Sequence, residues 1–368
     1  MASEWKTVRA ADFIEFNPRL SIKKGAMTTK VAMDKLQPFT KKIPAAELAE
    51  FAGGSKFCNG DTIMARITPC LENGKTAFVD FLKDGEIAFG STEFIVMRAR
   101  AGVSDPQFVY YLATSPAFRN IAIKSMVGSS GRQRVQQGVL DELELTVPPL
   151  GEQQKIGAFL AMLDLKIALN NKINDNLQQQ AQAIYASMFI DNADPAWVQG
   201  HLSDLITVKY GKDHKKLADG SYPVYGSGGI MRYVERPLYD KESVLIPRKG
   251  TLNNVMYVNQ PFWSVDTMFY TEMRLPNVAK FVYHFVKAKD LASMNAGSAV
   301  PSMTTDILNA MEVTIPSASA LEEFESLVAP MYRAMQENDI QSSKLSELRD
   351  ALLPKLMSGE IDVANIQL

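Results

Sequence analysis

Residues 145–188 read LTVPPLGEQQKIGAFLAMLDLKIALNNKINDNLQQQAQAIYASM, and residues 313–356 read VTIPSASALEEFESLVAPMYRAMQENDIQSSKLSELRDALLPKL. The two stretches align without gaps at a shift of 168 residues, which places LTVP at 145–148 on VTIP at 313–316. Self-similarity over this distance indicates a chain made of two copies of one unit. The repeat therefore determines the fold.

The repeat continues upstream of these stretches with small insertions. The tripeptide FVY at residues 108–110 returns at 281–283, and Trp5 followed by FI at 13–14 returns as Trp197 followed by LI at 205–206. Outside such landmarks the two copies differ strongly. Each copy is thus predicted to share a scaffold, a mixed domain followed by a helix, while the two surfaces differ.

Both aligned stretches predict long helices with a narrow apolar seam. Apolar residues recur at alternating steps of four and three, which is typical of a coiled coil rather than of a helix lying on a sheet. The seam comprises Ile156, Leu160, Leu163, Ile167, Leu177 and Ile184 in the first helix and Phe324, Val328, Met331, Leu345, Leu352 and Leu356 in the second, with Asn170 and Asn338 as polar interruptions.

A long helix with an apolar stripe needs a partner in water, and two copies in one chain can supply each other. The alternative is that each helix packs on its own domain. Two copies related by a twofold axis must pair their helices antiparallel. Placing Ile156 opposite Leu352 then predicts that Asn170 lies opposite Asn338 at the middle of the pair.

In both mixed domains the sequence predicts more strands than helices. Strands are expected at residues 62–67, 76–81 and 94–98 and again at 243–247, 255–258 and 267–273, with helices at 106–118 and 278–287. We expect an α+β fold: two domains with mixed, strand-rich sheets, separated by two long helices that form an antiparallel coiled coil, with an internal pseudo-twofold repeat.

Composition narrows the class of protein. The chain has 368 residues, 39 Lys and Arg against 41 Asp and Glu, and two cysteines. Two cysteines cannot build a disulfide framework, and neither a signal-peptide core nor an apolar run long enough for a membrane helix is evident. We therefore expect a cytoplasmic protein without a membrane partner.

Catalytic motifs are missing from the sequence. NGKT at residues 73–76 resembles the end of a phosphate-binding loop, but Pro69 occupies the position of the first glycine, so a hairpin turn fits better. The three histidines and two cysteines are too scattered to predict a metal site. We expect a protein that recognises a partner rather than one that catalyses a reaction.

The sequence PPLGEQQKI at residues 148–156, which begins the first helix, resembles the specificity subunit of type I restriction-modification systems. LLPKLMSGEI at 352–361, GRQR at 131–134 and YPVYGSGG at 222–229 are similar to further landmarks of that family. One departure is SASAL at 317–321, where the first copy has PLGEQ, so contacts made there are expected to differ between the copies.

The resemblance implies a first target-recognition domain at residues 1–147, a first coiled-coil helix at 148–192, a second domain at 193–315, a second helix at 316–358 and a C-terminal tail at 359–368. Each domain would read one half of an asymmetric, bipartite site in double-stranded DNA. The helices would dock two modification subunits, and restriction subunits with translocase activity would join them. S-adenosylmethionine, ATP and Mg would belong to those partners, leaving this non-catalytic chain without a cofactor.

Proteins that read DNA contact the phosphates with positively charged side chains and the base edges with polar side chains. The candidates are Lys23, Lys24, Lys41, Lys42, Arg66, Lys75, Arg132, Gln133 and Arg134 in the first domain, and Lys209, Lys212, Tyr225, Arg232, Arg248, Lys249, Asn253 and Asn254 in the second. A solvated surface is the plain alternative for any one of them. Two other function classes stay open: a structural coiled-coil adaptor without DNA contact, and a stand-alone DNA-modifying enzyme.

Overall fold

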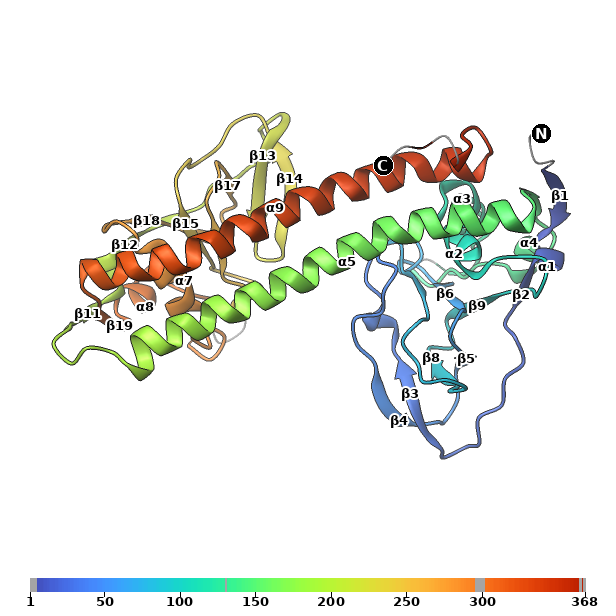
Figure 1. Cartoon of the computed structure of the whole chain (residues 1–368), viewed down its shortest axis with the longest axis horizontal. Coiled ribbons are helices and arrows are strands. Elements are labelled where there is room, and N and C mark those ends of the chain that lie inside the picture. The colour runs from blue at the N-terminus through green and yellow to red at the C-terminus, as the bar shows by residue number, and fades with distance from the viewer. Residues whose placement is uncertain (1–4, 130, 295–301, 364–365, 367–368) are drawn as a thin grey trace. The chain divides into compact units, whose positions relative to one another are not determined.

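The computed structural model describes residues 5–129, 131–294, 302–363 and 366 (Figure 1). The chain divides into two compact units: unit 1 comprises Met1–Asn171 and Asp339–Leu368, and unit 2 comprises Lys172–Asn338. Each unit contains one mixed domain and one half of each long helix. Residues 364, 365, 367 and 368 of the predicted C-terminal tail lie outside the described residues.

The two long helices are α5 (Leu150–Ala186) and α9 (Ala318–Met357). Figure 1 shows them passing through each unit in opposite directions. The last turns after α5, Ser187–Asp191, widen into a π-helix. Most of the stability of a helix in a protein comes from packing of its apolar face, so both helices depend on the seam and on their contacts with the domains.

The first turn of α5 is tied to its own domain by Gln153, the first glutamine of PPLGEQQ. Its side chain is 2% exposed, donates to the carbonyls of Pro148 (2.9 Å) and Val103 (3.1 Å), and accepts from the amide of Asp105 (3.0 Å). The equivalent residue of α9 is Leu321, which is buried and apolar. The departure between the two copies therefore replaces a hydrogen-bonded anchor by a hydrophobic one.

Pairing of the helices is antiparallel, as predicted. In unit 1, Asn170 donates to Gln341 Oε1 (2.9 Å) and Ser342 Oγ (3.2 Å), and Arg349 pairs with Asp164 (2.6 Å). In unit 2, Asn338 donates to Asn174 Oδ1 (2.8 Å). As the residue number rises along α5, the number of the contacting residue on α9 falls, as in an antiparallel pair.

The predicted register is wrong by one helical turn. It placed Asn170 opposite Asn338, whereas the partner of Asn338 within unit 2 is Asn174, four residues further along α5. Both registers bring seam positions opposite seam positions, so apolar periodicity alone does not separate them. The polar hydrogen bonds and the Asp164–Arg349 ion pair fit only the observed one.

Unit 1 contains a four-stranded antiparallel sheet in the order β2-β9-β6-β7, a second four-stranded sheet in the order β4-β3-β8-β5, and the pair β1-β10. The strands are β1 (Lys6–Arg9), β2 (Ile14–Phe16), β3 (Met27–Val31), β4 (Glu47–Glu50), β5 (Ser55–Phe57), β6 (Thr62–Ala65), β7 (Thr76–Phe78), β8 (Ala88–Gly90), β9 (Phe94–Ala99) and β10 (Glu144–Val147). The helices are α1 (Ala10–Phe13), α2 (Pro106–Thr114), α3 (Pro116–Lys124) and α4 (Gln137–Asp141), with a 3-10 turn at Met33–Lys35.

Unit 2 repeats the first of these sheets strand for strand. Its order β12-β18-β15-β16 matches β2-β9-β6-β7, and β11-β19 matches β1-β10, while the other sheet is the three-stranded β14-β13-β17. The elements are β11 (Val198–His201), α6 (Leu202–Leu205), β12 (Ile206–Tyr210), β13 (Asp219–Gly226), β14 (Gly229–Val234), β15 (Ser243–Pro247), β16 (Met256–Val258), β17 (Trp263–Ser264), β18 (Met268–Met273), α7 (Ala279–Lys287), α8 (Thr305–Asn309) and β19 (Glu312–Ile315). The α+β class and the internal repeat are confirmed.

One predicted helix is divided in two. The expected helix at 106–118 ends at Thr114, and α3 begins at Pro116. Proline has no N–H to continue the hydrogen-bond ladder and forces the residue before it to be extended. Ser115 accordingly has φ −61° and ψ 144°, and its side chain caps α3 by accepting from Phe118 N.

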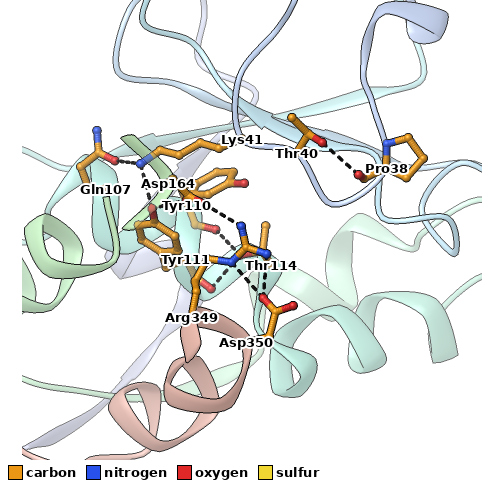
Figure 2. A network of polar contacts seen from close by, with 10 residues as sticks. All are labelled: Pro38, Thr40, Lys41, Gln107, Tyr110, Tyr111, Thr114, Asp164, Arg349 and Asp350. Carbon is orange, nitrogen blue, oxygen red and sulfur yellow. Dashed lines mark hydrogen bonds and ion pairs between the residues drawn. The ribbon is translucent and has the colours of Figure 1, made fainter. Parts of the chain in front are cut away.

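A buried polar network joins the unit 1 domain to both long helices (Figure 2). Tyr111 of α2 donates to Asp164 of α5 (2.5 Å), and Arg349 of α9 donates to the other oxygen of that carboxylate (2.6 Å). Lys41 donates to Gln107 and to the Tyr111 hydroxyl (3.0 Å). Burial, followed by the charge of Asp164, raises the pKa of Tyr111 far above its usual value.

Unit 2 has a neutral network at the equivalent position. FVY aligns with FVY and the helices align at 168 residues, so His284 corresponds to Tyr111 and Tyr332 to Asp164. His284 Nδ1 donates to Gln182 Oε1 (2.7 Å), and its Nε2 accepts from the Tyr332 hydroxyl (2.9 Å). Burial, with a smaller contribution from Lys287, lowers the pKa of His284 to about 4.

Replacing Arg349 by Ala should destabilise unit 1 by about 2–3 kcal/mol, because it leaves the largely buried Asp164 carboxylate without its cation. Hydrogen exchange of the α2 amides would measure the destabilisation. The double variant Asp164→Leu/Arg349→Leu should recover most of it, and the exposed Arg333→Ala is the matched control on α9. A change below about 0.5 kcal/mol in Arg349→Ala would contradict this role for the ion pair.

Acid should destabilise unit 2 through His284. Its folded pKa lies below the unfolded value of about 6.5, so protons bind the unfolded chain preferentially and stability falls as pH drops from 6.5 towards 4. His284→Gln should flatten that decline by about 2 kcal/mol. Urea unfolding followed by tryptophan fluorescence in a Trp5→Phe background reports on unit 2, where Trp197 and Trp263 lie. The exposed His201→Gln is the control, and equal slopes for His284→Gln and wild type would refute the assignment.

Candidate nucleic-acid interface

An arginine directly follows the equivalent inner strand of each repeated sheet. Arg66 follows β6: its N–H donates to Glu93 O, and its carbonyl accepts from Val135 N, both at 2.9 Å. Arg248 follows β15 and makes the same two backbone bonds, with Thr267 O and Met303 N, again at 2.9 Å. The scaffold therefore places these two predicted DNA-contacting residues at corresponding points of the two units.

The guanidinium groups of this arginine pair have different surroundings. Arg66 donates to Val135 O (3.2 Å), and its Nε is buried without a hydrogen-bond partner among the described residues. The Arg248 guanidinium lies over the ring of Tyr210, 5.3 Å from its centroid, and donates to Asp266 O (3.4 Å). Tyr210 is 52% exposed, so this stacked pair faces solvent.

The loop that follows Arg248 contacts the β13–β14 hairpin. Asn254 donates to Ser227 O in the hairpin turn (2.8 Å), while Asn253 donates to Asp290 (3.0 Å) and accepts from the Ala292 amide (3.0 Å). These bonds hold the loop in place. Both asparagine side chains thus support the loop, and Lys249 between Arg248 and them is exposed without an ion pair among the described residues.

The remaining unit 2 candidates are partly engaged with neighbours. Lys209 lies 3.7 Å from Glu272, Arg232 pairs with Asp219 (2.7 Å), and the Tyr225 hydroxyl accepts from Gln260 (3.3 Å). Lys212 has an exposed side chain, while its backbone carbonyl accepts from Trp263. Lys212 and Lys249 are therefore the two lysines of this set that are exposed and form no ion pair among the described residues.

Two loops of unit 1, residues 66–75 and the described residues 127–129 and 131–134, are fixed to each other. The Thr68 amide donates to Gln133 O, and the Gln133 amide donates to the Thr68 hydroxyl, both at 3.0 Å. Arg134 forms an ion pair with Glu93 at 2.6–3.0 Å. Lys75 donates to Met33 O (3.0 Å). Arg132 is exposed at the tip of the second loop. The ion-paired Arg134 shapes the loop, while Arg132 is available to a ligand.

The four lysines predicted to contact DNA in the basic segment of unit 1, residues 19–42, comprise one that points inward and three that are exposed. Lys41 lies against the rings of Tyr111 (4.6 Å), Tyr110 and Phe78, and burial lowers its pKa to about 8. Its ammonium belongs to the network of Figure 2 and is withdrawn from the surface. Lys23, Lys24 and Lys42 are exposed. Their contact with DNA stays a prediction.

Sequence reasoning missed Tyr210, although it sits between Lys209 and Lys212 at the end of β12. An aromatic residue inside a basic run is a signal that could have identified it, because aromatic and guanidinium planes stack on each other and on bases. Asp164 and Arg349 were also missed. Arg349 had a signal in the sequence, because it occupies a seam position between Leu345 and Leu352 where the first helix has Ala181. Asp164 had none, since it is one of several charged residues on its helix.

Metal-binding clusters and membrane-spanning helices are both absent from the part of the chain that the structure describes. Within residues 5–129, 131–294, 302–363 and 366, no group of three or more His, Cys, Asp or Glu residues has the arrangement to hold a metal ion. Among the helices of those same residues, none has the length and apolarity required to cross a membrane.

Two repeated domains with matching scaffolds and different loop chemistry define a paired recognition module. The model of the family described as type I restriction modification DNA specificity domain matches residues 2–179 and 196–324. The two matches together cover well over half of the chain, one in each copy of the repeat. The chain belongs to this family and carries its DNA specificity domain twice.

Individual relatives agree with the family. The chain is 24% identical over 413 residues to the type I restriction enzyme HindI specificity subunit of Haemophilus influenzae, covering 82% of this chain and 86% of that protein. It is 22% identical over 303 residues to the MjaIX specificity subunit of Methanocaldococcus jannaschii, covering 71% and 70%. The type I S subunit structure from M. genitalium has a TM-score of 0.58 at 17% identity over 96% of both chains, which supports the fold.

Replacing Lys23, Lys24 and Lys42 together by Ala should weaken binding to duplex DNA irrespective of sequence, because exposed cations contact phosphates. For every phosphate that these lysines neutralise, the variant should reduce the slope of log affinity against log salt by about 0.9. Titrations at several salt concentrations measure that slope. Lys41→Met, which removes an inward cation from the same segment, is the matched control and should leave it unchanged. An unchanged slope in the triple variant would assign these lysines to a merely solvated surface.

Proposed function

We propose that this chain is the DNA-reading subunit of a type I restriction-modification complex, in which each mixed domain reads one half of an asymmetric, bipartite target. The observation that carries this proposal is the arginine pair. Arg66 and Arg248 occupy the same point of two copies of one sheet, yet the Arg66 guanidinium donates to Val135 O while the Arg248 guanidinium lies over the ring of Tyr210. Two domains that read different half-sites need corresponding positions on the scaffold and different side chains around them.

The division of labour in the complex follows from the same proposal. This chain contributes recognition in the cytoplasm and no catalytic group. Two modification subunits dock on the α5–α9 pair and bring S-adenosylmethionine chemistry, and restriction subunits bring ATP, Mg and translocation. The helix pair supports this assignment, because its antiparallel halves give each mixed domain an equivalent place beside it.

Exchanging residues 1–147 for the corresponding domain of another specificity subunit should change one half of the methylated sequence and leave the other half intact. Exchanging residues 193–315 should do the reverse. Sequencing of methylated positions in host DNA carrying each chimaera gives the readout. A chimaera that alters both halves, or an exchange of either domain that alters the same half, would refute the assignment of one half-site to each domain.

A further inference from the structure

Unit 1 contains a cavity of about 190 Å³ beside the buried network of Figure 2. Phe39, Tyr110 and Tyr111 supply its aromatic lining, and Leu353 lines it from α9. A cavity of about 150 Å³ is large enough to hold a benzene ring, whereas drug-sized ligands occupy about 300 Å³ or more. The size of this cavity therefore suits one small bicyclic molecule.

Two buried hydroxyl groups open onto the cavity. Tyr110 is 4% and Thr76 3% exposed, and neither hydroxyl forms a hydrogen bond among the described residues (Figure 2 for Tyr110). Burial, followed by the charge of Asp164, raises the pKa of Tyr110 far above its usual value, so its phenol stays neutral and can both donate and accept. Because burying a polar group without a partner is unfavourable, two such groups on one cavity indicate a ligand with a polar edge.

The repeat supplies an internal control for the Tyr110 hydroxyl. FVY aligns with FVY, so Tyr283 is its counterpart in unit 2. The Tyr283 hydroxyl accepts from Lys287 and donates to Gln178 Oε1 (3.4 Å). Lys287 corresponds to Thr114, whose shorter side chain donates to carbonyls of its own helix instead. The scaffold thus allows this tyrosine to be satisfied by protein groups, and unit 1 leaves it open.

The space beside the tyrosine is also filled differently in unit 2. Leu353 corresponds to Tyr185, 168 residues earlier. The Tyr185 ring stacks on His284, the counterpart of Tyr111, with ring centroids 5.5 Å apart. A leucine at the same position in unit 1 is too small to cover Tyr111 in this way. The fold therefore does not require a cavity at this point.

Phe39 lies at the cavity in a backbone conformation that is unfavourable for a bulky residue. Its φ of +53° falls in the left-handed region, its N–H donates to Gly74 O (3.0 Å), and the Arg119 guanidinium lies over its ring, 5.1 Å from the centroid. Phe39 is nevertheless 61% exposed. Strain of this kind persists where the surrounding structure imposes it, and it gathers at ligand clamps. A ligand in the cavity would cover this exposed ring.

The lining also indicates the chemical class of the ligand. Its charges balance, since the guanidinium groups of Arg119 and Arg349 stand against the carboxylates of Asp164 and Asp350. A balanced lining favours a neutral molecule over a phosphate. Aromatic side chains stack on a flat ring, and hydroxyl groups pair with both donors and acceptors. A purine base is flat, bicyclic and neutral, and its edge carries both kinds of group.

We propose that this cavity binds a purine base, which packs on the rings of Phe39, Tyr110 and Tyr111 and places its polar edge on the Tyr110 and Thr76 hydroxyls. The site is additional to the proposed function and does not depend on it, because every group that forms it belongs to unit 1 and the base can be titrated against this chain alone.

Calorimetric titration of the full chain with adenine tests the proposal. Wild type should bind adenine saturably and should bind indole, a flat bicyclic ring with a single N–H, about tenfold more weakly. Tyr110→Phe should weaken adenine binding about tenfold and leave indole binding unchanged, without lowering the thermal unfolding temperature. Leu353→Tyr, which copies unit 2, should abolish binding of both. Tyr283→Phe, which removes the partnered hydroxyl of unit 2, is the matched control and should bind adenine as wild type does.

Oligonucleotides distinguish the two sources of a purine. Displacement of adenine by oligo(dA) and not by oligo(dT) would identify a base presented by a nucleic-acid strand, and displacement by neither would identify a free base. Three results would overturn the proposal and assign the cavity to water: no saturable adenine binding to wild type, equal affinity for adenine and indole, or adenine binding that Tyr110→Phe and Leu353→Tyr both leave unchanged.

Discussion

Burial of two narrow apolar seams is the constraint on which the rest of this structure depends. Exposing the apolar seams of helices of 37 and 40 residues to water is unfavourable. Each seam is buried against the helix of the other copy of the repeat. Antiparallel pairing follows, and with it the interleaved units in which each half of α5 packs on the opposite half of α9. Within each unit the repeated sheet, rather than the helices, gives Arg66 and Arg248 the same backbone bonds.

The sequence was sufficient to predict the repeat, the long helices and three of the four strands in each repeated sheet, β6, β7 and β9 and their counterparts β15, β16 and β18, because these are periodic or self-similar. It was insufficient for the register. A slip of one turn brings seam residues opposite seam residues again, so apolar spacing leaves two solutions of similar burial. The choice depends on a few directional contacts, such as Asn338 with Asn174, whose geometry no pattern encodes. The break at Ser115, by contrast, was predictable, because Pro116 cannot continue the hydrogen-bond ladder of a helix and forces the residue before it to be extended.

Candidate site residues were predictable as a class and not individually. Lys41 and Lys42 are adjacent in the sequence, yet one ammonium lies among tyrosine rings and the other is exposed. Both residues lie in a bend of the chain, and in this bend the Lys41 ammonium lies over the rings of Tyr110 and Tyr111. Arg132 and Arg134 also differ, because Arg134 forms an ion pair with Glu93. Counting charges locates the basic segment, but only the fold shows which cations are already used.

The two copies also separate what the scaffold requires from what it merely permits. Tyr111 with Asp164 and His284 with Tyr332 fill one buried position with charged and neutral chemistry, so that position requires hydrogen bonding and no particular charge. A hydrogen-bonded ion pair at one end and a neutral network at the other make the two ends of the helix pair chemically distinct. In unit 1, Arg349 supplies the cation beside the Asp164 carboxylate, whereas the repeat counterparts of these two residues in unit 2, Ala181 and Tyr332, are uncharged. The same scaffold position therefore joins its domain to a long helix through a charged network in unit 1 and through a neutral one in unit 2.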